Sequence, residues 1–95
     1  MSDIDDTRLT VAARARYHCE VCGKPTPLGR GQMAHRIPQR KRNLKKYGKA
    51  VIHHPRNLAW TCGLECNAAV SLGAHTAEIE RLADEIRREL WQNRD

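Results

Sequence analysis

Cysteines and histidines are the residues of this sequence whose chemistry suits metal binding or proton transfer. The four cysteines form two close pairs, Cys19 with Cys22 in "HCEVCGKP" and Cys62 with Cys66 in "TCGLEC". Zinc in structural sites takes four thiolate or imidazole ligands arranged as a tetrahedron. The spacing therefore predicts one structural Zn²⁺ held by all four cysteines. Four protein ligands leave that ion no open position, so any catalysis must occur elsewhere.

The alternative to a zinc site is that the cysteines form two disulfides or remain four free thiols. The redox compartment of the protein decides which of these states is favoured. The first residues, "MSDIDDTRLT", are polar and acidic and do not resemble a signal peptide. No apolar run approaches the roughly 18 residues of a membrane span. We therefore expect a cytoplasmic protein with no membrane partner, in which reduced thiols favour zinc.

The histidines differ in their sequence surroundings. His35 lies in "GQMAHRIP", within a strand-like segment at 31–38 that ends at Pro38. A neutral imidazole can accept a proton near pH 7 when a hydrogen bond to its other nitrogen fixes the tautomer. His35 is thus either a general base or a hydrogen-bonded structural side chain. The other histidines are His18, His53, His54 and His75.

Positive charge is concentrated in the middle of the chain. The formal net charge is +6 with an isoelectric point near 9.6, and no Asp or Glu occurs from Val21 to Leu64. Charge of one sign repels itself, and an anionic polymer relieves that repulsion. We therefore predict DNA as a partner, contacted mainly through its phosphates. The predicted contact residues are Arg36, Arg40, Lys41, Arg42, Lys45, Lys46, Lys49 and Arg56.

The remaining pattern predicts a single α+β domain over residues 1–95. Residues 5–17 favour a helix with acidic residues in its first turn. The apolar run "NLAWTC" predicts a second strand paired with 31–38, and "GLECNAAVSLG" a helix capped by Gly73. The basic segment "QRKRNLKKYGK" between the strands is consistent with a helix or a loop.

Apolar residues at helical spacing predict a long helix over about 76–92. Ile79, Leu82, Ala83, Ile86 and Leu90 form one stripe on it. The stripe either packs on the rest of the domain, which we favour, or forms a homodimer contact. With 4% aromatic residues the core is thin, so zinc would add needed stability. We expect the two tryptophans in the core rather than stacked on bases: Trp60 and Trp91.

Four motifs together resemble the HNH endonuclease family, the ββα-metal nucleases of the small four-cysteine-zinc type. They are the Cys-x2-Cys pair, "AHRIP", "HHPRNLAW" and the Cys-x3-Cys pair followed by Asn67, and they run from about Cys19 to Ala69. The resemblance implies a zinc-stapled, treble-clef-like ββα-metal core at about 17–73, flanked by the N- and C-terminal helices. His35, Asn57 and Asn67 occupy the family's three motif positions, which makes the chain an H-N-N variant.

What the resemblance implies about activity is metal-dependent hydrolysis of DNA phosphodiester bonds, as an endonuclease or a nickase. His35 would be the general base, and Asn57 would hold the geometry of strand and loop around it. Asn67 would bind a catalytic divalent cation through its amide oxygen. Oxygen ligands suit Mg²⁺ or Mn²⁺, whereas imidazole ligands favour Mn²⁺, Ni²⁺ or Zn²⁺.

One position departs from the family pattern. Family members commonly carry Asp or His just before the base as the second protein ligand of the catalytic cation, and here that residue is Ala34. Mg²⁺ often keeps several waters and takes the rest of its ligands from substrate phosphates. Alternatively, a histidine of "HHP" replaces the missing ligand. We favour His54 over His53, which we expect to face solvent.

The absent ligand leaves a second function open. A catalytically degenerate domain would still bind DNA or a partner protein through its zinc-stabilised fold, and charge alone does not distinguish DNA from RNA. The resemblance places such domains in bacteriophage and prophage genomes. A bacterial host cell and a packaging or recombination partner are therefore further expectations.

Overall fold

The centre of the fold is an antiparallel pair of short strands. The computed structural model describes residues 3–92. In it, β1 (Gln32–His35) pairs with β2 (Leu58–Thr61), with Gln32 opposite Thr61 and His35 opposite Leu58. All of β2 is buried, as its apolar sequence predicts. Pairing stops after His35, where the Arg36 amide donates to the Asn57 carbonyl at 2.8 Å instead.

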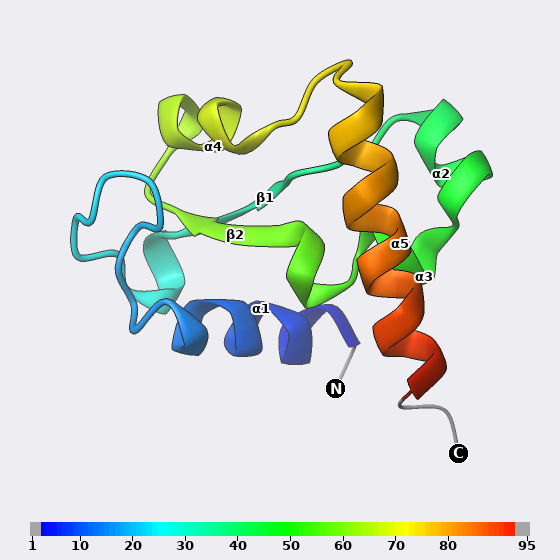
Figure 1. Cartoon of the computed structure of the whole chain (residues 1–95). Helices are drawn as coiled ribbons and strands as arrows, with labels where there is room; N and C mark the ends of the chain where they lie inside the picture. The colour runs from blue at the N-terminus through cyan, green and yellow to red at the C-terminus, as the bar shows by residue number, and fades with distance from the viewer. Residues whose placement is uncertain (1–2, 93–95) are drawn as a thin grey trace.

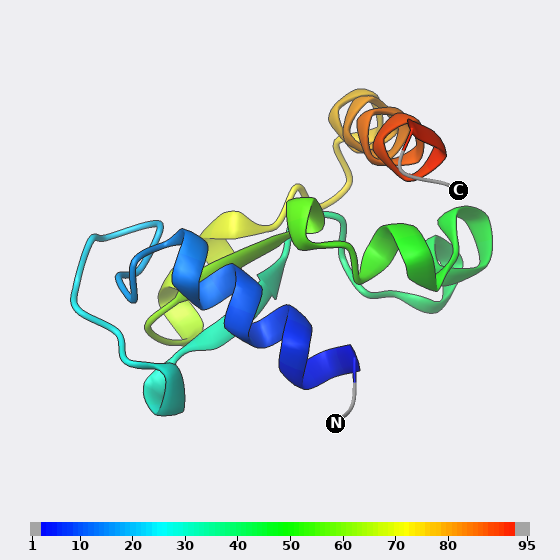
Figure 2. The same ribbon diagram turned by 90° about the horizontal axis from the view of Figure 1, so that it is seen from below.

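Two helices cover opposite faces of this strand pair. Helix α1 (Asp3–Arg14) lies on one face and α4 (Leu64–Val70) on the other, as Figures 1 and 2 show. Successive strand residues point to opposite faces. Met33 packs with Val11 and Trp60 on the α1 face, whereas Ala34 packs with Ala59 and Val70 on the α4 face.

A separate group of helices packs beside the sheet (Figure 1). It contains α2 (Lys41–Tyr47), α3 (Lys49–Ile52) and α5 (Thr76–Gln92). The predicted stripe of α5 packs on α2, α3 and Ile37, which follows β1, so the stripe belongs to the core of the domain. Two short 3-10 turns complete the chain at Leu28–Arg30 and Pro55–Asn57. We call the apolar cluster between these helices the second core. Its buried members are Ile37, Tyr47, Val51, Ile52, Ile79, Ala83 and Ile86.

The structure corrects three details of the sequence reading. Helix α1 ends at Arg14, because Arg16 and Tyr17 adopt positive φ values of 54° and 59°. Helix α4 ends with Ser71 as its C-cap, and Gly73 instead forms the turn that leads to α5. Trp60 is fully buried as predicted, but Trp91 is 72% exposed, because it lies outside the stripe of α5 that packs on the second core.

No helix within residues 3–92 combines the length and the apolar character that crossing a membrane requires.

The basic segment forms α2, which is followed by Gly48 with φ +84°. The chain then turns into α3, a second helix that the sequence alone does not separate from α2. Positive φ favours glycine at this junction, so the direction of α3 depends on it.

Gly31 lies against the buried ring of Trp60, and we expect its replacement by Ala to be destabilising. A Cβ at position 31 would lie 2.0 Å from the Trp60 ring. Overpacking of this kind costs about 1–3 kcal/mol. Urea unfolding should show that loss for Gly31→Ala. Gly29→Ala is the matched control, since a Cβ there meets nothing within 4 Å. Equal stability of the two variants would contradict the close approach.

Candidate metal centre and the His35 cleft

A tight turn presents the first cysteine pair. The Cys19 amide donates to the Lys24 carbonyl and the Gly23 amide to the Cys19 carbonyl, each at 2.9 Å. Gly23 has φ +79°, and a bridge between His18 and Pro25 closes the turn. This arrangement holds Cys19 and Cys22 on one side of a rigid loop.

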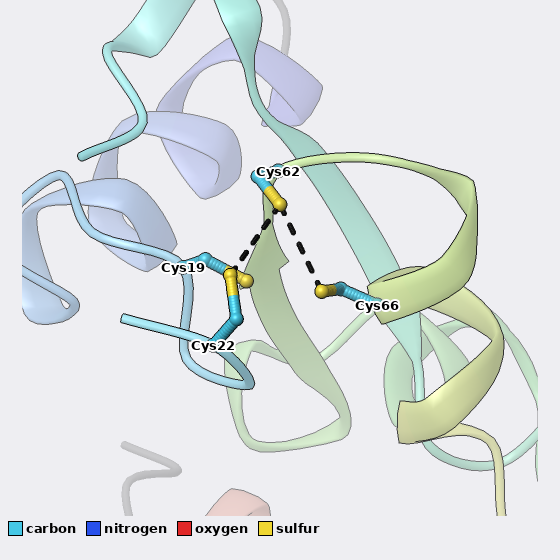
Figure 3. A group of neighbouring side chains, drawn as sticks. All are labelled: Cys19, Cys22, Cys62 and Cys66. Carbon is cyan, nitrogen blue, oxygen red and sulfur yellow. Dashed lines mark hydrogen bonds between the residues drawn. The ribbon is translucent and has the colours of Figure 1, made fainter. Parts of the chain in front are cut away.

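The second cysteine pair comes from the end of β2 and the start of α4. Cys62 follows the strand directly, and Cys66 lies in the first turns of α4, whose Asn67 amide donates to the Gly63 carbonyl at 2.9 Å. All four Sγ atoms lie within 4.8 Å of one another (Figure 3). The Cys62 sulfur is 3.6 Å from that of Cys22 and 3.7 Å from that of Cys66.

These distances fit a tetrahedral metal site. Four sulfurs at about 2.3 Å from one zinc ion are separated by about 3.8 Å. A disulfide would require about 2.05 Å between two sulfurs, so all four cysteines are free thiols in this geometry. The cluster can therefore hold a structural metal ion such as zinc. It ties the N-terminal turn to β2 and α4.

Backbone hydrogen bonds stabilise the thiolate form of Cys19 in this cluster. Burial raises the pKa of Cys19, but hydrogen bonds from the backbone at Cys22, Val21 and Cys62 outweigh it and lower that pKa to about 6. Hydrogen bonding with Cys19 and Cys62 raises the pKa of Cys66 to about 12. Four neighbouring thiols do not all ionise by themselves, because the thiolates would repel one another. A bound divalent cation offsets this repulsion and allows all four to ionise.

His35 lies at the other end of β1, at the edge of a cleft of about 460 Å³. Its Nε2 is 3.3 Å from Nδ1 of His53, and the two rings are nearly perpendicular, at 75°. Partial burial, and secondarily His53, lower the pKa of His35 below its usual 6.5, so the ring is neutral at pH 7. The cleft is lined by Thr7, Met33, His35, Gln39, Lys49, Ala50, His53 and Leu58.

The two histidines of "HHP" point in different directions. His53, the C-cap of α3, is exposed and turns its ring toward His35. His54 instead uses Nδ1 to accept the Arg56 amide at 3.1 Å, while its Nε2 lies 3.9 Å from Glu89 of α5. His54 is therefore engaged with the second core, and it is His53 that lies in the cleft. The sequence predicts the reverse assignment, because it does not show how α3 ends.

Asn57 is fully buried directly before β2 and is bonded to two residues of the second core. Its Oδ1 accepts the Ile37 amide at 2.8 Å, and its Nδ2 donates to the carbonyls of Ile52 at 2.8 Å and Ile37 at 3.3 Å. The side chain thus joins the segment after β1 to the end of α3, so it fixes the backbone on both sides of the cleft.

Asn67 lies on the opposite face of the strand pair from His35. Its Nδ2 donates to Oε1 of Gln32 at 3.1 Å. Gln32 alternates with Met33 along β1 and shares the α4 face with Ala34, whereas His35 shares the α1 face with Met33. The structure therefore does not bring Asn67 and His35 together. Ala34 itself is 0% exposed, and its methyl group fills the space against Ala59 and Val70.

The predicted phosphate contacts fall into two groups. Ion pairs with α5 neutralise Lys46, which contacts Glu80, and Arg56, which contacts Glu85 and Glu89. Within the described residues no ion pair involves the others. These are Arg36, Arg40, Lys41, Arg42, Lys45 and Lys49.

Within residues 3–92 the structure thus shows two candidate functional sites, the four-cysteine cluster and the His35 cleft, at opposite ends of β1. The pairing of His53 with His35 and the contribution of Gln39 and Lys49 to the cleft were missed by sequence reasoning. The doubled histidine of "HHP" was the one available signal. Comparisons with protein-family models, curated proteins and solved structures find no match for this chain.

Proposed function

We propose that this protein is a metal-dependent DNA endonuclease or nickase in which His35 takes a proton from the attacking water. The observation that carries the proposal is the place of His35, a neutral imidazole at the edge of a cleft of about 460 Å³. Hydrolysis of a phosphodiester needs such a base within reach of the water. The cleft has room for a phosphate and its neighbouring atoms beside the ring.

His53 supports this role by holding one nitrogen of the base. In the productive tautomer, Nε2–H of His35 donates to Nδ1 of His53 across 3.3 Å. Nδ1 of His35 then keeps its lone pair and accepts the proton. A hydrogen bond that fixes the tautomer is the usual way in which a protein selects the basic nitrogen of histidine.

The protein itself supplies few ligands for the divalent cation that the proposed reaction needs. A divalent cation stabilises charge on the departing 3′ oxygen of a phosphodiester. Asn67 and His54, the ligands expected from the sequence, both lie away from the His35 cleft, the first bonded to Gln32 and the second to Arg56. Waters and substrate phosphates would therefore supply most ligands of Mg²⁺ or Mn²⁺.

Cationic side chains at the cleft and on the helix before it support a nucleic-acid substrate. Lys49 lines the cleft, and the exposed residues Lys41, Arg42 and Lys45 lie on α2, which precedes it. None of them is neutralised by an ion pair within residues 3–92. Contacts of this kind track phosphates without reading sequence.

Nicking of supercoiled plasmid tests the proposal. We expect relaxed circles with Mg²⁺ or Mn²⁺, no nicking without added cation, and a loss of about 10²–10⁴-fold in rate for His35→Ala, the usual contribution of a general base. His75→Ala is the matched control, since His75 is exposed and is not one of the residues that line the cleft. Circular dichroism and zinc content should match between the variants. Nicking that survives His35→Ala would overturn the assignment of the base.

A second function is favoured by one observation, the apolar packing of Ala34. The position that carries a cation ligand in the resembled family is here buried against Ala59 and Val70. A zinc-stabilised module that binds DNA without cutting it is consistent with that packing. In the same experiment, salt-sensitive plasmid binding by the folded wild type with no nicking in any cation would favour the module over the nuclease.

A further inference from the structure

The two imidazoles in the cleft have the spacing of a metal-binding pair. Nε2 of His35 and Nδ1 of His53 lie 3.3 Å apart with their rings at 75°. Two nitrogens bound at about 2.0–2.1 Å to one ion are separated by about 3.0 Å in octahedral and 3.4 Å in tetrahedral geometry. The observed separation lies between these two values, so an ion can be held by both nitrogens once each ring tilts to turn its lone pair from the other nitrogen toward the ion.

Both histidines are held by backbone that is itself fixed. His35 is the last residue of β1 and pairs with Leu58. His53 is the C-cap of α3, and its amide donates to the Lys49 carbonyl at 2.9 Å. Ligands on such elements are already organised, so binding does not require a disordered loop to fold.

The chemistry of the cleft selects the class of ion. Its lining residues offer two imidazoles and the Gln39 amide, and include no carboxylate. Neutral nitrogen ligands suit Ni²⁺, Cu²⁺ and Zn²⁺, whereas Mg²⁺ and Ca²⁺ prefer charged oxygens. Lys49 lines the same cleft, and its charge opposes a cation and weakens binding. Solvent reaches the pair directly, because His53 is exposed.

We propose that His35 and His53 form a second metal site, a two-nitrogen chelate for a borderline divalent ion such as Ni²⁺, Cu²⁺ or Zn²⁺. This site is separate from the four-cysteine cluster. Both rings remain neutral when the ion binds, so the His35 proton moves from Nε2 to Nδ1 and the His53 proton stays on Nε2.

Occupancy of this site has a consequence for the reaction, and that consequence rests on the proposed function. The ion holds the His35 proton on Nδ1, which is the nitrogen that must be unprotonated to accept a proton from water. Ni²⁺ or Zn²⁺ at the pair therefore blocks the base and inhibits nicking supported by Mg²⁺. Metal binding itself does not depend on any activity.

Calorimetric titration with Ni²⁺ tests the site in protein that already carries one zinc per chain. We expect one Ni²⁺ to bind the wild type, and His53→Gln and His35→Gln each to weaken binding by at least about tenfold, since each removes a ligand. His75→Gln should bind as the wild type does. Electron paramagnetic resonance of one equivalent of Cu²⁺ should show two coupled nitrogens in the wild type and fewer in His53→Gln.

Binding unaffected by either cleft substitution, or absorption from nickel–thiolate charge transfer, would overturn the proposal, because the ion would then lie elsewhere. Nicking in Mg²⁺ adds the second readout: one equivalent of Ni²⁺ should inhibit the wild type but not the residual activity of His53→Gln. Binding without inhibition would refute the link to the base and leave the metal site standing. Wild type that binds Ni²⁺ but never nicks would refute the proposed nuclease alone.

Discussion

Cys62→Ser is expected to abolish metal binding by the four-cysteine cluster and with it the cooperative fold. The sulfur of Cys62 lies 3.6 and 3.7 Å from two other cysteine sulfurs, so it is central to the cluster. Zinc bound by small four-ligand domains contributes on the order of 10 kcal/mol. Whole domains are stable by only about 5–15 kcal/mol. Metal analysis should therefore show less than one zinc per chain, and thermal unfolding followed by circular dichroism should lack a transition.

Val21→Ser is the matched control for this loss. Val21 lies between the first two cysteines, is 46% exposed and serves the cluster only through its backbone. The control should retain one zinc and a melting temperature close to that of the wild type. A Cys62→Ser protein that unfolds cooperatively at the same temperature as Val21→Ser would contradict a structural role for the cluster.

Asn57→Ala is expected to destabilise the fold by about 3 kcal/mol or more. The change leaves three buried backbone groups without a partner: the amide and carbonyl of Ile37 and the carbonyl of Ile52. Each unsatisfied buried group costs about 1–3 kcal/mol, and the lost volume adds a cavity. Urea unfolding measures the loss directly.

Asn67→Ala is the matched comparison, because it removes the same side chain from a half-buried site. Its amide makes one hydrogen bond to the Gln32 side chain, so we expect a cost of only about 0.5–1.5 kcal/mol. If Asn57→Ala remained within 1 kcal/mol of Asn67→Ala, the role of Asn57 in joining the backbone at Ile37 to that at Ile52 would be wrong.

Local patterns in the sequence were sufficient for much of the fold. The stripe of α5 predicts both the helix and its buried face, since Ile79, Ala83 and Ile86 recur at helical spacing. The apolar run around Trp60 predicts β2. Cysteine spacing predicts the cluster, because each pair is held by a few residues of local chain and only the pairing of the two turns is long-range.

Elements that depend on packing were less predictable. Trp91 lies in an apolar stretch and still faces outward, because Leu90 before it packs on the second core and the next helical position points about 100° away. The ion pairs of Lys46 and Arg56 with α5 could not be inferred either. Their partners are 34 residues away in the first case and 33 and 29 in the second, so only the approach of α5 creates them.

The sequence by itself determined that this is a small basic α+β chain with a cysteine set suited to zinc, a strand bearing His35 and a long amphipathic helix. These properties follow from composition and short-range periodicity. The tertiary structure alone decided which side chains meet. It turned His53 rather than His54 toward His35 and placed Asn67 on the other sheet face. It also filled the space at Ala34 with Ala59 and Val70. The physical reason is that strand alternation and the end of α3 set these directions, and both depend on contacts between distant segments.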